Sequence, residues 1–175
     1  MHIALNQTPD GRGLRIGLVV SRYHDAVTGA MRDGAERAFI EAGGSTDDLL
    51  MVEAPGAFEL PALAAAVAET GRVDAVVTLG CIITGETTHD RYIAHAVADG
   101  LTRLSIERVL PVALGVLTCQ TIEQAEARAG GDQGNKGAEA MAAAIASARQ
   151  IRALRGHRST TGIPADTTHQ QGAWT

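Results

Sequence analysis

The sequence contains few aromatic residues, few cysteines and no excess of basic residues. Aromatic side chains make up 3% of its 175 residues, and only 2 residues are cysteine. Two cysteines cannot build the disulfide framework of a small secreted domain. The 15 Lys and Arg against 20 Asp and Glu give a net charge of −5, so the chain lacks the basic surface that binds nucleic acid or an anionic membrane. We expect no nucleic-acid partner, and an anionic ligand must be held by a few placed groups.

Long apolar segments are missing as well. The longest uninterrupted runs, such as 62–68 and 140–146, fall far short of the ~18 residues that a membrane-spanning helix needs. Residues 1–13 lack the apolar centre of a signal peptide. These absences predict a protein of the cytoplasm without membrane contact.

The two cysteines, Cys81 and Cys119, each stand at the end of an apolar run. No zinc-binding spacing is present, and neither cysteine is flanked by a base that would activate a catalytic thiol. We therefore interpret both as small buried apolar groups in a reducing compartment.

What the chain does contain is typical of one globular domain: 45% of its residues are apolar and 20% are charged. Short runs rich in Val, Ile and Leu predict buried parallel strands at residues 14–20, 49–54, 74–79 and 109–117. Helical spacing predicts helices at residues 26–42, 59–69, 92–108, 121–128 and 136–154. Strands that alternate with helices indicate an α/β three-layer sandwich with a four-stranded parallel sheet.

Three segments follow from this pattern. Residues 1–13 form an N-terminal segment, and residues 14–156 form the domain, with glycine-rich turns between the predicted elements. The periodicity stops after Gly156, and residues 157–175 are predicted to be a disordered tail. The sequence shows no internal repeat.

Ligands of an open parallel sheet bind beyond the carboxyl ends of its strands, so the segments after the predicted strands are the candidates for a site. Tyr23 and Phe58 both fall in these segments and could offer a flat face to a planar ring. Alternatively, Phe58 packs a helix onto the sheet and Tyr23 is an ordinary surface residue. The spacing leaves both interpretations open.

The segment after the third strand carries the other candidates. The turn at residues 85–88 precedes a helix, and its backbone N–H groups could bind a phosphate, although such a turn is often only a helix cap. His89 beside it is the best candidate for a proton-transfer residue, because imidazole gains and loses protons near neutral pH; alternatively it is an exposed first-turn histidine. A metal site made of Glu86, His89 and Asp90 is a weaker alternative, because three neighbouring ligands at a helix start seldom converge.

Two cations follow the fourth strand. Arg128 ends a short helix before a glycine-rich turn, and Lys136 begins the last helix. A guanidinium group is a preferred partner of phosphate, but both side chains could equally be solvated charges.

From about residue 14 to residue 154 the sequence resembles the lumazine synthases. The resemblance rests on motifs in a fixed order: Pro55-Gly56-Ala57-Phe58-Glu59-Leu60-Pro61, Leu79-Gly80-Cys81-Ile82-Ile83-Thr84-Gly85-Glu86-Thr87-Thr88-His89, Gly115-Val116-Leu117-Thr118, Thr121-Ile122-Glu123-Gln124-Ala125, and Arg128-Ala129-Gly130 with Gly134-Asn135-Lys136-Gly137. It implies a flavodoxin-like fold and a role for each matching residue.

By this resemblance, Tyr23 stacks on a pyrimidine ring. The ribityl chain would be contacted by Ala57, Phe58 and Glu59. The edge of the ring would be held by Cys81, Ile82 and Ile83. The phosphate would accept hydrogen bonds from the backbone N–H groups of Glu86 and Thr87. His89 would transfer protons. Leu114, Arg128 and Lys136 would come from a neighbouring subunit, with Arg128 paired to the phosphate.

The implied reaction joins 5-amino-6-(D-ribitylamino)uracil to 3,4-dihydroxy-2-butanone 4-phosphate without metal or cofactor. It yields 6,7-dimethyl-8-ribityllumazine, phosphate and water in the penultimate step of riboflavin biosynthesis. The resemblance also implies a homopentamer, and the length of residues 129–135 fits members that pack further into a sixty-subunit icosahedral capsid. Riboflavin synthase is a further candidate partner.

The sequence departs from the family pattern at three places. Asp90-Arg91 follows His89 where an aromatic residue and then an acid are common, Leu114 replaces a frequent aromatic or polar residue, and His24 replaces a usual Asn. The group that would orient His89 is thus displaced by one residue. Two other interpretations stay open: a module that binds a flavin or pteridine without catalysis, and a shell protein that only assembles.

Overall fold

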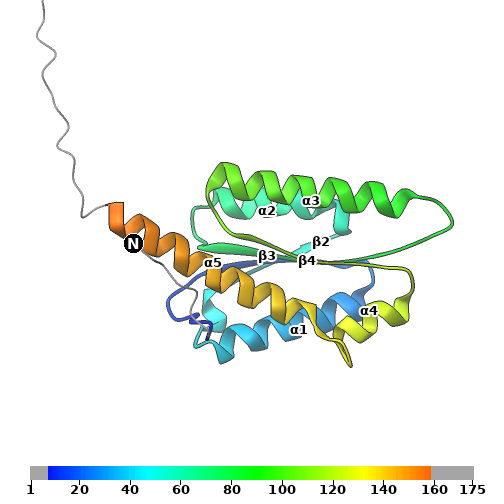
Figure 1. Cartoon of the computed structure of the whole chain (residues 1–175), viewed down its shortest axis with the longest axis horizontal. Helices are drawn as coiled ribbons and strands as arrows, with labels where there is room; N and C mark the ends of the chain where they lie inside the picture. The colour runs from blue at the N-terminus through cyan, green and yellow to red at the C-terminus, as the bar shows by residue number, and fades with distance from the viewer. Residues whose placement is uncertain (1–7, 159–175) are drawn as a thin grey trace, which may run out of the picture.

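The structure, a computed structural model, describes residues 8–158 of the chain (Figure 1). A four-stranded sheet lies at its centre, with the order β2-β1-β3-β4 and every neighbouring pair parallel. Its strands are β1 (Ile16–Ser21), β2 (Leu49–Ala54), β3 (Ala75–Ile83) and β4 (Val112–Cys119). The predicted four-stranded parallel sheet is confirmed.

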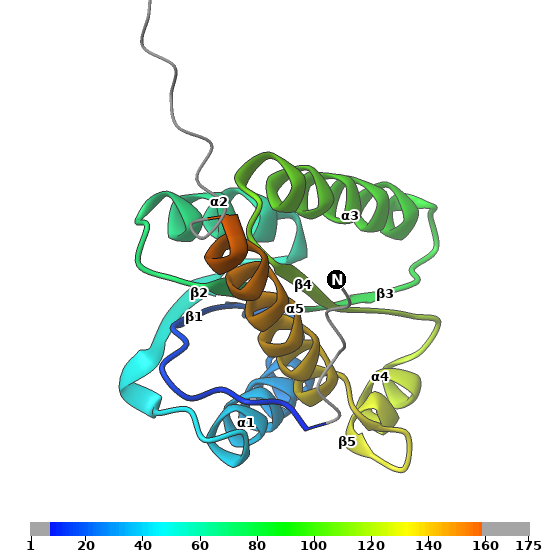
Figure 2. The same cartoon turned by 60° about the vertical axis from the view of Figure 1, so that its left-hand side comes forward.

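Helices cover both faces of the sheet in three layers (Figures 1 and 2). One face carries α2 (Leu60–Glu69), which a short 3₁₀ helix η2 (Ala57–Glu59) precedes, and α3 (His89–Arg108). The other face carries α1 (Asp25–Glu41), α4 (Ile122–Arg128) and α5 (Lys136–Arg158). A second 3₁₀ helix, η1 (Thr46–Asp48), and a two-stranded hairpin of β5 (Ala129–Gly131) and β6 (Gly134–Asn135) complete the fold. The α/β three-layer sandwich is therefore confirmed.

Two apolar cores hold these layers together. Alternate side chains of a strand point to opposite faces, so Leu18 of β1 lies in the core beneath α1 and α5, whereas Val19 lies in the core beneath α2 and α3. Strands buried on both faces read as continuous apolar runs, which is why the sequence predicted β1 and β3. None of the helices within residues 8–158 is long and apolar enough to cross a membrane.

The end of β3 differs from the prediction. We expected the strand to stop at residue 79, because Gly80 looked like a turn, but β3 continues to Ile83 and pairs with β4 throughout. A Cβ atom at Gly80 would lie 3.0 Å from Cδ1 of Leu60. This glycine therefore lets the start of α2 approach the strand and ends no element.

Other boundaries differ as well: β1 is Ile16–Ser21 where 14–20 was predicted, and β4 is Val112–Cys119 where 109–117 was predicted. The prediction began one helix at residue 59 and another at residue 92, whereas α2 begins at Leu60 after η2 and α3 begins at His89. The hairpin β5–β6 stands where a glycine-rich turn was expected. The last helix continues beyond Gly156 to Arg158, and the rest of the predicted tail, residues 159–175, lies outside the described residues.

Candidate active site

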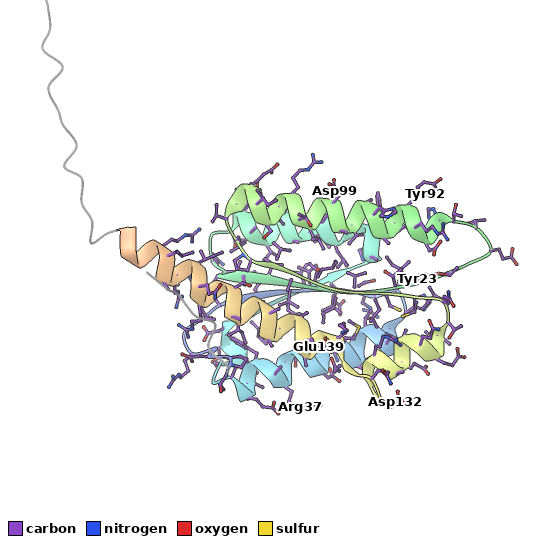
Figure 3. All side chains as sticks on the ribbon, viewed as in Figure 1. Tyr23, Arg37, Tyr92, Asp99, Asp132 and Glu139 are labelled. Carbon is purple, nitrogen blue, oxygen red and sulfur yellow. The ribbon has the colours of Figure 1, made fainter. Side chains whose placement is uncertain are left out.

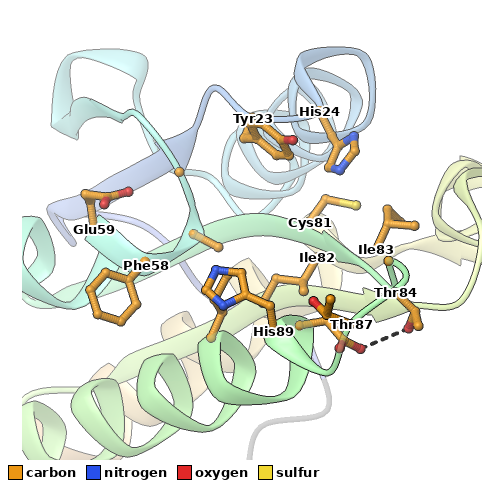
Figure 4. A pocket seen from close by; sticks show the side chains of 15 residues that line it. Tyr23, His24, Phe58, Glu59, Cys81, Ile82, Ile83, Thr84, Thr87 and His89 are labelled. Carbon is orange, nitrogen blue, oxygen red and sulfur yellow. Dashed lines mark hydrogen bonds between the residues drawn. The ribbon is translucent and has the colours of Figure 1, made fainter.

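A cavity of about 610 Å³ opens beyond the carboxyl ends of β1, β2 and β3, at the edge of the sheet where ligands of such folds bind. Its volume lies within the range of small-molecule sites. Most of the residues that the sequence singled out line it: Tyr23, Ala57, Phe58, Glu59, Cys81, Ile82, Ile83, Thr87 and His89. Tyr23 and His24 form one side, and Phe58 and His89 face them from the other (Figure 4).

Tyr23 stands on a turn fixed by the end of β1. Its backbone N–H donates to the buried Ser21 hydroxyl over 3.2 Å, and the N–H of Arg22 donates to the carbonyl of Ala54 in β2 over 2.8 Å. The ring itself is 66% exposed, and it lies at the same end of the molecule as the start of α3, where Tyr92 is found (Figure 3). A ring that is held at its base and open on its face can stack on a planar ligand.

Phe58 and Glu59 belong to η2, which follows β2 after Pro55 and Gly56. Ala57 and Leu60 on either side are buried and hold this turn against the sheet, while the Phe58 ring remains 61% exposed. The interpretation of Phe58 as a residue that packs a helix onto the sheet is therefore not supported. Glu59 is half-buried and lines the cavity, where a carboxylate can accept hydrogen bonds from hydroxyl groups.

The last residues of β3 form the floor of the cavity. Cys81 and Ile82 point to opposite faces of the sheet, and both are buried at its carboxyl end. Burial, reinforced by Cys119 nearby, raises the pKa of the Cys81 thiol from 9.0 to about 12. Cys81 therefore remains a neutral thiol and serves as an apolar wall, as the sequence predicted, because only a thiolate is a good nucleophile.

The loop from β3 to α3 carries exposed, unpaired donors. Within the described part of the chain, the backbone N–H groups of Gly85, Glu86 and Thr87 donate no hydrogen bond. The loop leads into the first turn of α3, where the helix dipole also favours an anion. Both ends are fixed, since the N–H of Thr84 donates to the carbonyl of Cys119 over 2.9 Å and its hydroxyl donates to Asp90 Oδ2 over 3.0 Å.

His89 is the first residue of α3 and projects an exposed imidazole into the cavity (Figure 4). None of the other described residues forms a hydrogen bond with this imidazole. Asp90, the nearest acid in sequence, is engaged by Thr84 instead. The imidazole thus faces the cavity, where it can exchange protons with a ligand, and no side chain within residues 8–158 hydrogen-bonds to it.

Four predicted site residues do not line the cavity: Glu86, Leu114, Arg128 and Lys136. Glu86 lies in the adjoining loop. Leu114, on the outer strand β4, is 51% exposed, Arg128 donates from Nη1 to the Gln124 carbonyl over 2.9 Å, and Lys136 pairs with Glu139 at 2.5 Å. A single subunit therefore supplies the aromatic faces and the imidazole of the site but not these cations.

Asn135 anchors the hairpin that lies between the two cations, and its role was not identified from the sequence. Its side-chain amide donates to the carbonyls of Ala30 and Ala129, each over 2.9 Å. Its side-chain oxygen accepts from the N–H groups of Gly137 and Ala138 and so caps α5. The side chain thus ties the hairpin between Arg128 and Lys136 to α1 and α5.

Six further lining residues were not assigned a substrate contact from the sequence, although Gly85 belongs to the turn proposed there to bind phosphate and Asp90 was weighed as a metal ligand. His24, Gly56, Thr84, Gly85, Asp90 and Ile93 complete the cavity. Most of them directly precede or follow a predicted site residue, so the neighbourhood of each motif was the available signal. Within residues 8–158, no group of three or more His, Cys, Asp and Glu side chains is arranged to hold a metal ion.

The arrangement suits a flat, polar ligand next to an anionic group, with a proton-transfer residue between them. Comparison with known protein families supports this description. The family model for 6,7-dimethyl-8-ribityllumazine synthase matches residues 13–152, which include the whole sheet and every element that lines the cavity. The chain belongs to the 6,7-dimethyl-8-ribityllumazine synthase family.

Proposed function

We propose that the protein condenses 5-amino-6-(D-ribitylamino)uracil with 3,4-dihydroxy-2-butanone 4-phosphate to form 6,7-dimethyl-8-ribityllumazine in the cytoplasm. The family implies riboflavin biosynthesis, small-molecule substrates and a homo-oligomer. The observation that carries the specific proposal is the cavity itself, in which two exposed aromatic faces, an unpaired imidazole and a loop of free N–H groups meet.

The aromatic end of the cavity would hold the pyrimidine. The pyrimidine ring would stack on Tyr23, and its edge would contact Cys81, Ile82 and Ile83, which are neutral and apolar. The ribityl hydroxyl groups extend along η2, where Glu59 accepts hydrogen bonds and Phe58 covers the carbon chain.

The loop between β3 and α3 would hold the phosphate of the keto substrate. The N–H groups of Glu86 and Thr87 donate to it, and the helix dipole of α3 adds attraction. This places the ketone beside His89 and the amine of the pyrimidine, and holding two reactants in line can contribute several kcal/mol to the lowering of the barrier.

The chemistry then proceeds by proton transfers. The amine attacks the ketone carbon, and water leaves to give an imine. The adjacent carbon then loses a proton as phosphate leaves the terminal carbon, and the resulting enol tautomerises to a second ketone. The second amine closes the ring with loss of another water. His89 moves the protons in these steps, which typically contributes 10²–10⁴-fold to a rate.

Each site would be completed by a neighbouring subunit. Among the described residues, no Lys or Arg side chain lines the cavity to pair with a phosphate dianion, whereas Arg128, Lys136 and the exposed Leu114 lie elsewhere on the same chain. A ring of five subunits that brings these residues to the next subunit's cavity supplies the cation. Such rings can pack further into a sixty-subunit capsid, and riboflavin synthase, which consumes the product, is a candidate partner.

Turnover tests the proposal directly. The purified protein is mixed with both substrates, and the lumazine chromophore is followed together with released phosphate. We expect the two products to form in equal amounts, and neither substrate alone should give the chromophore. Binding of the pyrimidine without product formation would contradict the proposal.

One observation favours a second candidate, a module that binds a flavin or pteridine without catalysis. The His89 imidazole has no hydrogen-bond partner among the described residues, so it could lack the orientation that proton transfer requires. Such a module would quench ligand fluorescence and give no product in the same assay. A protein that only forms a shell would show neither binding nor turnover.

A further inference from the structure

The side chain of Asn135 uses every hydrogen-bonding group that it has. Its amide nitrogen donates to the carbonyls of Ala30 and Ala129, each over 2.9 Å. Its oxygen accepts from the N–H groups of Gly137 and Ala138 over 2.9 and 3.1 Å. An amide offers two N–H donors and an oxygen with two lone pairs, so its capacity is filled. One side chain therefore joins α1, the hairpin β5–β6 and the first turn of α5.

Helix capping explains only half of this arrangement. The cap of α5 needs an acceptor, and a serine or an aspartate at position 135 would supply one as well as an asparagine does. The two donated hydrogen bonds need an NH₂ group, and they lead away from α5, to the hairpin and to α1. The amide therefore has a second role, which is to hold the hairpin against α1.

Two glycines allow the three segments to approach this closely. A Cβ atom at Gly34 of α1 would overlap the Asn135 side chain, and one at Gly137 of α5 would overlap the carbonyl of Met31. Figure 2 shows the start of α5 beside α1, with α4 and β5 next to it. Because larger residues would force the segments apart, the junction is closely packed on both sides and has little freedom to shift.

Arg128 and Lys136 stand at the two ends of this junction. Arg128 directly precedes Ala129, whose carbonyl accepts from Asn135, and Lys136 directly follows Asn135 in the first turn of α5. Both cations are half-buried, and neither lines the cavity of its own chain. Asn135 thus fixes the backbone next to both cations, and with it the spacing between their charges.

We propose that Asn135 is a positioning residue for phosphate binding, which sets Arg128 and Lys136 at the spacing at which both reach one phosphate group in the cavity of the neighbouring subunit. The inference rests on the proposed function, which brings both cations to that cavity. A charge-assisted hydrogen bond depends on distance and direction, so two cations bind one dianion well only when the backbone between them is fixed. Asn135 itself contacts neither substrate and acts through these two side chains.

Two substitutions separate the tether from the cap. Asn135→Ser keeps an oxygen that can cap α5 and loses both donors, without adding a charge near the cations. Asn135→Ala loses the donors and the cap. Ser45→Ala is the matched control, because Ser45 caps η1 by accepting from the N–H of Asp47 and does not line the cavity.

The readouts are the KM of each substrate, kcat and the midpoint of thermal unfolding. We expect both Asn135 variants to raise the KM of the keto-phosphate by a similar factor, about 3–20-fold, because each loses the same two hydrogen bonds. The KM of the pyrimidine should not change. The unfolding midpoint should fall further in Asn135→Ala than in Asn135→Ser, since the alanine variant also loses the cap. Ser45→Ala should lower the midpoint and change neither KM.

Reassembly shows in which subunit's site the residue acts. Asn135→Ser and His89→Ala chains are unfolded together in equal amounts, reassembled, and assayed at a keto-phosphate concentration well below KM, where Asn135→Ser is slow. If Asn135 acts on the neighbouring site, about a quarter of the interfaces are intact on both sides, and activity should reach about a quarter of the wild-type value or slightly more. Action within one chain would give only the mean of the two variants reassembled alone.

Distinct results would overturn the inference. An unchanged KM of the keto-phosphate in Asn135→Ser, with normal turnover by the wild-type protein, would reduce Asn135 to a helix cap and leave the proposed function intact. Equal increases in both KM values would assign the residue a merely structural role. Activity at the mean of the separate variants, after verified mixing, would contradict action on the neighbouring site. If the wild-type protein forms no lumazine from the two substrates, the proposed function itself is wrong and the inference falls with it.

Discussion

The Thr84 hydroxyl donates a 3.0 Å hydrogen bond to the Asp90 carboxylate and so joins the end of β3 to the first turn of α3. The bond closes the loop that carries the free N–H groups proposed to bind phosphate, and Figure 4 shows it at the rim of the cavity. It also engages the carboxylate nearest in sequence to His89. The shape of the loop proposed to bind phosphate therefore depends on this pair.

Removal of this hydroxyl should weaken binding of the keto-phosphate. We expect Thr84→Val to raise the KM of that substrate about 2–10-fold, since one hydrogen bond contributes about 0.5–1.5 kcal/mol, and to leave the KM of the pyrimidine unchanged. Thr88→Val is the control, because the Thr88 side chain forms no capping hydrogen bond. Equal effects on both KM values would argue against a role in phosphate binding.

His89 should act on the rate and not on binding. We expect His89→Ala to lower kcat by roughly 10–1,000-fold and to keep the affinity for the pyrimidine, because a proton-transfer residue acts in the transition state. The measurement is single-turnover formation of the lumazine, with pyrimidine affinity determined separately. An unchanged single-turnover rate would remove His89 from the mechanism.

Two glycines of α1 should respond in opposite ways to the same substitution. A Cβ atom at Gly34 would lie 2.3 Å from the Asn135 side chain, whereas Gly29 has nothing within 4 Å. Gly34→Ala should lower the free energy of unfolding by about 1–3 kcal/mol through overpacking, and Gly29→Ala should raise it by about 0.5–1 kcal/mol through helix propensity. Denaturant titration measures both, and equal responses would refute the close packing of α1 on Asn135.

The raised pKa of Cys81 predicts how its reactivity depends on pH. Alkylation follows the thiolate, so in the folded protein the rate should keep rising up to pH of about 12, whereas in the unfolded chain it levels off above about pH 9. At pH 8 the folded thiolate fraction is roughly 1,000-fold smaller than the unfolded one. Iodoacetamide labelling of the wild-type chain with and without guanidinium, with the Cys81 and Cys119 peptides separated by mass spectrometry, measures this ratio. Similar rates in both states would contradict burial of the thiol.

Local patterns in the sequence predicted a strand well where it coincides with one short run bounded by polar or turn residues. The run 49–54 is bounded by polar and turn residues and became β2 with the predicted limits. Gly80 misled the prediction because its reason for being glycine, the approach of Leu60, lies twenty residues away in the chain. Propensity and periodicity carry no information about such contacts between distant segments.

The residues of the candidate site also fall into two groups: those that local sequence patterns identify, and those that act through contacts between distant segments. Tyr23, Phe58 and His89 follow predicted strands, and the rule that ligands bind at carboxyl ends marked them as candidates. The family resemblance was needed to favour their functional interpretation. Asn135 acts through a contact made only after folding, with Ala30 on α1. Arg128 does not line the cavity of its own chain, as the family resemblance implied, whereas its position in the sequence alone did not distinguish it from a solvated charge.

The central claim is that each active site combines His89 of one subunit with Arg128 of the next. Arg128→Ala should mainly lower the affinity for the keto-phosphate, since a charged hydrogen-bond partner contributes about 1.5–3 kcal/mol. We would unfold His89→Ala and Arg128→Ala chains together, reassemble them, and measure lumazine formation against each variant reassembled alone. With equal amounts and random mixing, about a quarter of the interfaces pair an intact His89 with an intact Arg128, and activity should recover to about a quarter of the wild-type level. Activity that stays at the level of the separate variants, after mixing is verified by mass spectrometry, would show that both residues act within one chain and would contradict the shared site.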